Sequence, residues 1–140
     1  MLGLFKPKKK STQAKILVAD DEPDYISAIQ FHLSWSNYEI IVAGDGKETL
    51  EKAASEKPDL ILLDTTMPVM NGHEVLEHLS KDPQLKDIPV IMVTATCDVQ
   101  DIATASSYGI ADYVTKPFDF GELVEKIANA LENKKALSNA

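Results

Sequence analysis

Five short apolar runs, each followed by a segment of helical character, constrain the fold of this chain more than any other feature. The runs have the length and apolar content of buried strands, and they occupy residues 15–19, 38–43, 59–63, 88–93 and 111–115. Helical segments fall between and after them, at about residues 23–35, 46–56, 72–81, 98–107 and 119–134. Strict alternation of strands and helices predicts a parallel sheet with right-handed crossovers and helices on both faces. We therefore predict an α/β fold with a single doubly wound five-stranded parallel sheet.

The charge of the chain is unevenly distributed. The formal net charge is −8, yet residues 1–10 contain four of the 14 lysines and no acid, so ten lysines and 22 acids remain for the rest. A chain of 140 residues with 44% hydrophobic content fits one domain. We place it at residues 14–134, between a flexible basic tail at 1–13 and a short C-terminal tail at 135–140. Phosphate backbones would repel so acidic a body, and we expect no nucleic-acid binding.

Three observations favour a cytoplasmic protein. A single cysteine, Cys97, excludes an internal disulfide and fits a reducing compartment. No apolar run approaches the roughly 20 residues that a membrane span requires, and the opening MLGLFKPKKK lacks the apolar core of a signal peptide. Its apolar residues and lysines would allow weak contact with an anionic membrane, but we expect a disordered tail instead.

The residues that immediately follow the strands carry most of the polar chemistry of this sequence. They are, in chain order, Asp20, Asp21, Asp64, Thr94 and Lys116. In doubly wound sheets a ligand site lies beyond the carboxyl ends of the strands, where the strand order reverses. If the order is 2-1-3-4-5, Asp64 is central, its neighbouring strands are about 4.8 Å away and the fifth strand is about twice as far. The long Lys116 side chain then comes from the most distant strand, which predicts a single converging site.

Three carboxylates at one point repel each other unless a proton or a cation compensates them. A site of oxygen ligands without His or Cys fits a hard divalent cation, and we predict Mg²⁺. A carboxylate held beside Mg²⁺, a hydroxyl and an ammonium can attack a phosphoryl group while its neighbours balance charge on the phosphoryl oxygens. We therefore predict that Asp64, directly after a buried strand, becomes an aspartyl phosphate.

Four motifs together resemble those of response-regulator receiver domains of two-component systems. They are VADDEP, LLDTTMPVMNG, VTAT and DYVTKPF, in the right order and spacing over about residues 14–134. The resemblance implies a flavodoxin-like sheet of order 2-1-3-4-5 with five helices. It also implies a phosphoacceptor signalling domain that is not an enzyme beyond self-phosphorylation and autodephosphorylation. Its partners would be a histidine kinase or histidine phosphotransfer protein and a downstream target protein.

The same resemblance assigns roles to individual residues. Asp64 would be the phosphoacceptor and Lys116, before a cis peptide to Pro117, would hold the phosphoryl group. Thr94 and Tyr113 would form the switch pair, the hydroxyl moving toward the phosphate while the ring turns inward. The metal ligands would be Asp21, Asp64 and the backbone carbonyl of Thr66, with Asp20 reaching Mg²⁺ through water.

Other interpretations of single motifs are weaker. An EF-hand needs glycine where Tyr25 stands, sixth from Asp20. A P-loop ending at Lys47 needs glycine at Ile41 and Ser or Thr at Glu48. Without a nucleotide-binding loop, the phosphoryl donor must be another protein or a small phosphate ester.

Several further residues have a structural interpretation. We expect Glu22 and Asp24 to be solvated acids at a helix start. We also expect the three histidines, His32, His73 and His78, to lie at the surface. Cys97 and Trp35 have no chemical partner in the motif set, and we expect both to serve in packing.

Three function classes remain open. The first is a single-domain response regulator of chemotaxis or phosphorelay type, because only a short segment follows the last helix. The second is a phosphorylation-independent adaptor with the same fold. The third is a phosphohydrolase of the haloacid-dehalogenase type, although that family needs a second Asp where Thr66 stands. Since the chain contains no arginine for an arginine-dependent dimer interface, we expect a monomer or weak dimer.

Overall fold

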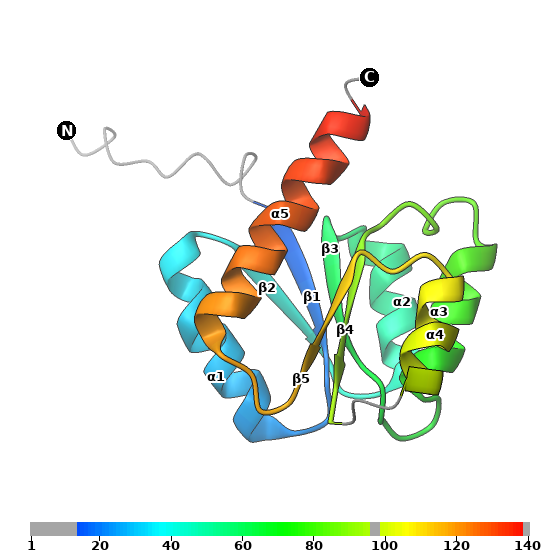
Figure 1. Ribbon diagram of the computed structural model, residues 1–140, viewed down its shortest axis with the longest axis horizontal. Coiled ribbons are helices and arrows are strands. Elements are labelled where there is room, and N and C mark those ends of the chain that lie inside the picture. The colour runs from blue at the N-terminus through cyan, green and yellow to red at the C-terminus, as the bar shows by residue number, and fades with distance from the viewer. Residues whose placement is uncertain (1–13, 96–98, 139–140) are drawn as a thin grey trace.

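A five-stranded parallel sheet forms the centre of the molecule (Figure 1). The structure is a computed structural model, and it describes residues 14–95 and 99–138. The strands are β1 (Lys15–Ala19), β2 (Glu39–Ala43), β3 (Leu60–Asp64), β4 (Val90–Thr94) and β5 (Asp112–Thr115). They lie in the order β2-β1-β3-β4-β5. The α/β class and the strand order expected from the sequence are both confirmed, and β3 is the central strand.

Helices cover both faces of this sheet, as Figure 1 shows. One face carries α1 (Pro23–Leu33) and α5 (Phe120–Ser138), with a short 3₁₀ turn, η3 (Ser34–Ser36), after α1. The other face carries α2 (Gly46–Glu56), α3 (Gly72–Lys81) and α4 (Val99–Ser107). Each helix returns the chain to the amino end of the sheet, so all five strands end at the same edge.

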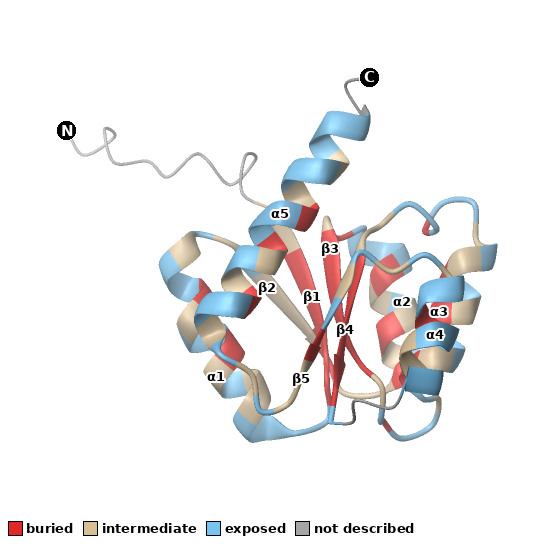
Figure 2. Ribbon diagram, in the orientation of Figure 1, coloured by how far each residue is buried: buried red, intermediate tan, exposed pale blue. Residues whose placement is uncertain are grey.

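The two faces of the sheet divide the core into two clusters. Along β3, Leu60 and Leu62 pack in the cluster beneath α1 and α5, whereas Ile61 and Leu63 pack in the cluster on the other face. This alternation follows from the two-residue period of a strand. All four side chains are almost fully buried, and burial of each contributes about 1.5–3 kcal/mol. Figure 2 shows the buried strands between helices whose outer faces are exposed.

Local signals in the sequence begin the helices. Pro23 stands in the first turn of α1, where its fixed φ suits a helix and its missing N–H is not needed. The Asp45 side chain caps α2 by accepting from the Glu48 N–H at 2.7 Å. Asn71 caps α3, and its backbone N–H donates in return to the Glu74 carboxylate at 3.0 Å. Each cap supplies a partner to a helix end that would otherwise lack one.

The last helix is longer than the sequence pattern predicted. We expected it to end near residue 134, before a short tail at 135–140, but α5 continues to Ser138. Residues 134–137 are Lys, Lys, Ala and Leu, which favour helix, and no Gly or Pro interrupts them. At 19 residues α5 is long, yet neither it nor any other helix in the described ranges has the apolar character that crossing a bilayer demands.

The predicted packing role of Trp35 is wrong. Its side chain lies in η3 and is 77% exposed. The first helix ends at Leu33 rather than near 35, and Asn37 adopts a left-handed conformation with φ of 61° before β2. The chain turns there, so that Leu33 points into the core while Trp35 points away from it. The predicted packing of Cys97 falls outside the described residues.

Candidate functional site

Buried polar side chains gather at the carboxyl edge of the sheet. Four polar or charged residues are buried in the described part of the chain, and three of them, Asp20, Asp64 and Thr94, follow or end β1, β3 and β4. Each is at most 4% exposed. Because β1 and β4 flank β3, Asp20 and Thr94 lie at the ends of the two strands next to the one that ends at Asp64, as predicted.

Three carboxylates form a compact cluster at this edge. One oxygen from each of Asp20, Asp21 and Asp64 can be chosen so that all lie within 4.8 Å of one another. The Glu22 N–H donates to Asp20 Oδ1 at 2.9 Å, and the Thr66 N–H donates to Asp64 Oδ1 at 3.2 Å. These backbone donors fix the orientation of the two buried carboxylates. An all-oxygen set of this kind fits a hard divalent cation.

Lys116 is the cation of the site. Its Nζ lies 3.0 Å from Asp20 Oδ2, 3.3 Å from Asp64 Oδ2 and 2.6 Å from Glu22 Oε1. The side chain is only 6% exposed, and Nζ stands 4.2 Å from the centre of the Tyr25 ring. The peptide bond from Lys116 to Pro117 is cis, as the resemblance implied. A long side chain from the edge strand therefore reaches the central strand.

The electrostatics of the site follow from burial and from these charges. Burial raises the pKa of Asp64 to about 6, with a further increase from the Asp20 charge, while the Thr66 N–H and Lys116 oppose the shift. Burial alone would lower the pKa of Lys116, but its ion pairs with Glu22, Asp20 and Asp64 raise it above its ordinary value. At neutral pH the site therefore holds an ionised Asp64 beside a charged ammonium.

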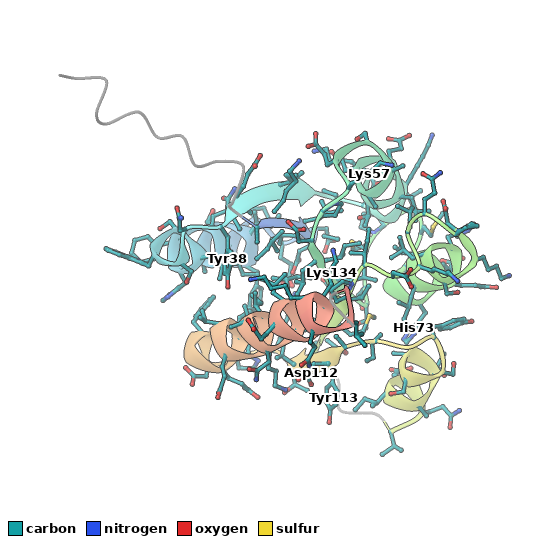
Figure 3. All side chains as sticks on the ribbon, turned by 90° about the horizontal axis from the view of Figure 1, so that it is seen from above. Tyr38, Lys57, His73, Asp112, Tyr113 and Lys134 are labelled. Atoms are coloured by element: carbon teal, nitrogen blue, oxygen red, sulfur yellow. The ribbon has the colours of Figure 1, made fainter. Side chains whose placement is uncertain are left out.

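The two residues expected to act as a switch, Thr94 and Tyr113, differ in their exposure to solvent. Thr94 is buried at the end of β4, and its Oγ1 accepts from the Thr65 hydroxyl at 3.2 Å. Tyr113 lies in β5, is 38% exposed and has Lys126 Nζ 5.4 Å from its ring centre. Figure 3 shows Tyr113 beside Asp112 at the margin of the molecule. Thr94 is thus buried at the carboxyl end of β4, whereas the Tyr113 ring is partly exposed.

Two contacts of Lys116 were missed in the sequence. We expected Glu22 to be a solvated acid, and its side chain is exposed, yet its carboxylate makes the shortest contact of Lys116. From the sequence we expected no role for Tyr25 beyond the exclusion of an EF-hand. Both stand at the start of α1, which directly follows the acid pair, and this position was the available signal.

A close approach of backbone to Asp64 was also missed. A Cβ added at Gly72 would lie 2.3 Å from the Asp64 carbonyl oxygen. The Gly72 N–H also donates to the Thr65 carbonyl at 3.0 Å. The glycine therefore lets the start of α3 pack against the end of β3 at Asp64, and its place in the MNG motif was the available signal.

The histidines are less uniformly exposed than expected. His78 is exposed, but His32 is half-buried and stacks on Phe120 with ring centres 3.9 Å apart. His73, labelled in Figure 3, is also half-buried, and its buried Nδ1 has no hydrogen-bond partner among the residues that the structure describes. None of the three contributes to the described carboxylate cluster.

Comparison with known proteins decides the family. A family model described as the response regulator receiver domain matches residues 16–128. This chain belongs to that family. Receiver domains are phosphoacceptor signalling domains of two-component systems rather than classical enzymes, and they interact with histidine kinases and downstream effectors. Receiver domains generally bind Mg²⁺ through an acidic pocket, and this chain has a cluster of Asp20, Asp21 and Asp64 at the carboxyl edge of its sheet.

Curated relatives of this receiver domain are longer proteins. The alkaline phosphatase synthesis transcriptional regulatory protein PhoP of Bacillus subtilis is 38% identical over 121 residues, which cover 86% of this chain and 50% of that protein. A probable transcriptional regulator, ycf27, of Cyanophora paradoxa is 42% identical over 117 residues, which cover 84% of this chain and 48% of that protein. The chain thus spans about half the length of these relatives.

Solved structures match nearly over their full length. The chemotaxis response regulator CheY4 of Vibrio cholerae has a TM-score of 0.79 at 29% identity, covering 84% of this chain and 98% of that one. A CheY-like receiver domain protein of Methanospirillum hungatei has a TM-score of 0.83 at 28% identity, covering 89% of this chain and 98% of that one. The chain therefore shares the receiver fold with these proteins over most of its length.

Proposed function

We propose that Asp64 accepts a phosphoryl group from a phosphohistidine of a histidine kinase or phosphotransfer protein, and that the modified domain then binds a target protein. One observation carries this proposal. The Asp64 carboxylate, 4% exposed at the end of the central strand, has Lys116 Nζ at 3.3 Å and two further carboxylates within 4.8 Å. That combination suits an acceptor carboxylate, because the negative charge of the phosphorylated product needs Lys116 and a metal ion nearby to compensate it.

The proposed transfer assigns a task to each side chain. An Asp64 oxygen attacks phosphorus, the bond from phosphorus to the donor nitrogen breaks, and the electron pair of that bond stays with the donor imidazole. Lys116 moves onto a phosphoryl oxygen, and the Thr94 hydroxyl donates to another. The Asp64 pKa of about 6 leaves the carboxylate ionised, and so nucleophilic, at neutral pH.

The proposed metal is Mg²⁺, which would neutralise charge on the phosphoryl oxygens when bound. Asp21, Asp64 and the Thr66 carbonyl would hold it directly, and Asp20 would hold it through water. Asp21 is exposed beside two buried acids, so that a hydrated ion can enter from solvent. Thr66 is also exposed, and its N–H already orients Asp64.

The test is the intact mass of the protein after incubation with acetyl phosphate and Mg²⁺. We expect a gain of one phosphoryl group in the wild type, and none in Asp64→Asn or when EDTA replaces Mg²⁺. Asp87→Asn, which removes an exposed carboxylate in the loop before β4, is the matched control and should gain the group. Equal labelling of Asp64→Asn and wild type would overturn the assignment.

The proposed output is a phosphorylation-dependent change on the face that contains Tyr113. In the unmodified protein Tyr113 is partly exposed, while Thr94 is hydrogen-bonded to Thr65. Movement of the Thr94 hydroxyl toward the phosphoryl group would leave space for the ring to turn inward. A target that bound wild type and Asp64→Asn equally under acetyl phosphate would contradict this output and support the adaptor alternative.

The single-domain character is likewise a proposal. The relatives of about twice this length are transcriptional regulators by name. The match to the chemotaxis response regulator CheY4, in contrast, covers 98% of the CheY4 chain. An immunoblot of the natural source should show a protein near 15.4 kDa. A band of about twice that mass would replace this proposal with a receiver joined to an output domain.

A non-enzymatic role is also proposed. A phosphohydrolase of the alternative type would place an acid–base Asp two residues after its nucleophile, and Thr66 occupies that position. We expect acetyl phosphate to be hydrolysed only as fast as phosphorylated Asp64 loses its phosphoryl group. We expect no hydrolysis of p-nitrophenyl phosphate. Sustained hydrolysis of the second ester would restore the phosphohydrolase.

A further inference from the structure

Tyr25 contacts the cation of the site through the face of its ring. Lys116 Nζ lies over this ring, 4.2 Å from its centre, and the Lys116 side chain is only 6% exposed. Tyr25 itself is half-buried in the first turn of α1. An ammonium over an aromatic ring is attracted by the ring quadrupole, and the attraction grows when water is excluded. The proposed transfer gives this contact no task so far.

Two side chains at the start of α1 are directed toward Lys116. Glu22 stands at the N-cap, yet its side chain makes no cap hydrogen bond and instead lies 2.6 Å from Lys116 Nζ. The Tyr25 ring also meets that of Phe118, in the loop after β5, with centres 5.6 Å apart. In Figure 1 the start of α1 lies beside this loop, and Phe118 packs against the core cluster beneath α1 and α5. The Tyr25 ring thus contacts both Lys116 and a ring that is anchored on the core.

The Tyr25 contact differs from the carboxylate contacts of Lys116 because it does not use up an N–H donor. Oxygens of Asp20, Glu22 and Asp64 lie within 3.3 Å of Nζ, and an ammonium has only three N–H donors. A phosphoryl oxygen can therefore receive one of these donors only when a carboxylate gives it up. The ring quadrupole attracts the charge itself rather than a particular N–H bond. Its contact can persist while the carboxylate partners change.

We propose that Tyr25 is a positioning residue for phosphoryl transfer, and that its ring holds the Lys116 ammonium in place while this ammonium exchanges a carboxylate for a phosphoryl oxygen. The inference rests on the proposed acceptance of a phosphoryl group by Asp64. A fixed and poorly hydrated cation stabilises developing charge well, because it needs no reorganisation during the reaction. The Glu22 carboxylate is less suited to this task, since its side chain is 54% exposed and solvent screens its charge.

The first test compares rates of labelling by acetyl phosphate with Mg²⁺, followed by intact mass. Tyr25→Leu removes the ring but keeps an apolar side chain, and we expect labelling about tenfold slower than in the wild type, a loss within the range of a cation–π contact. That factor corresponds to about 1.4 kcal/mol of transition-state stabilisation. Tyr25→Met, a second variant without a ring, should be slowed to a similar extent.

Two further variants separate the ring from the hydroxyl and from packing. Tyr25→Phe keeps the ring and should be labelled nearly as fast as the wild type. Tyr38→Leu is the matched control, because Tyr38 is a half-buried tyrosine that packs against the cluster beneath α1 and α5. Tyr38 directly precedes β2, at the amino end of the sheet, so its replacement should leave the labelling rate unchanged.

NMR measures the position of the ammonium independently, with no phosphoryl donor present. Nuclei above the face of an aromatic ring are shielded, so the side-chain protons of Lys116 next to Nζ should resonate upfield of those of the exposed lysines. The signal is assigned by its loss in Lys116→Met. We expect the upfield shift in the wild type and in Tyr25→Phe, and its loss in Tyr25→Leu.

Equal labelling rates of the wild type and Tyr25→Leu would overturn this inference and leave Asp64 as the acceptor. The inference would also fail if Tyr25→Phe were as slow as Tyr25→Leu, if Tyr38→Leu were slowed equally, or if the Lys116 signal of the wild type were not shifted. A wild type that gains no phosphoryl group would instead overturn the proposed function, and this inference with it.

Discussion

Replacing the proposed phosphoacceptor by its neutral isostere should make the resting protein more stable. Burial raises the pKa of Asp64 from 3.8 to about 6. A carboxyl group with a raised pKa binds its proton more tightly in the folded state, so the folded protein loses stability as the pH rises from about 4 to about 6. Above that window the ionised Asp64 is a permanent cost, and Asp64→Asn removes it.

The magnitude follows from the size of the shift. One pKa unit corresponds to about 1.4 kcal/mol, so a shift from 3.8 to about 6 corresponds to about 3 kcal/mol at most. The asparagine oxygen can still accept from the Thr66 N–H, and Lys116 keeps Asp20 and Glu22 as partners. We expect a net gain of about 2 kcal/mol, which shifts the urea midpoint by roughly 1 M.

Urea unfolding followed by far-UV circular dichroism, with EDTA present, measures this gain. We expect Asp64→Asn to exceed the wild type at pH 7.5 and the difference to fall below about 1 kcal/mol at pH 4, where Asp64 is protonated in the folded protein. Asp87→Asn should match the wild type at both pH values. If Asp64→Asn were less stable than the wild type at pH 7.5, the pairing with Lys116 would outweigh burial and the reasoning would fail.

Four further changes test separate parts of the site. Lys116→Met leaves two buried carboxylates without their cation, and chemical denaturation in EDTA should show a loss of about 3 kcal/mol that Mg²⁺ partly restores. Gly72→Ala forces a Cβ onto the backbone of Asp64 and should cost about 1–3 kcal/mol by thermal unfolding. Asn71→Ala removes the capping box of α3 and should cost about 1 kcal/mol in the same assay, with phosphoryl acceptance retained. Glu22→Gln removes the shortest contact of Lys116, and stopped-flow labelling with acetyl phosphate should show a changed rate, with Asp24→Asn unchanged.

The fold was predictable because a short apolar run followed by a segment of helical character occurs five times in the sequence. The apolar run of β3 ends at Asp64, and the same pattern of a short apolar run and a polar end recurs at Asp20 and Thr94. Strand order was harder to predict, since periodicity alone does not say which strands pair. The match of side-chain length to distance favoured one order, because only a long side chain such as Lys116 could reach Asp64 from the sheet edge.

The residues that were misjudged depend on directions that a sequence pattern does not contain. Glu22 stands one residue after the acid pair, and only the turn into α1 brings its carboxylate to 2.6 Å from Lys116. Trp35 was expected to serve in packing, but the end of α1 at Leu33 and the left-handed Asn37 direct it to solvent. The role of Gly72 is set by the approach of two backbone segments. In all three cases the missing information was the direction of the chain between regular elements.

Three carboxylates, those of Asp20, Glu22 and Asp64, hold the Lys116 ammonium in the site of the unmodified protein. Before any donor arrives, it already occupies the position between β1 and β3 where positive charge is required. Desolvation of the cation has therefore occurred during folding. In the proposed transfer Lys116 would exchange a carboxylate partner for a phosphoryl oxygen, so the cost of burying this ammonium would not be part of the cost of the change of state.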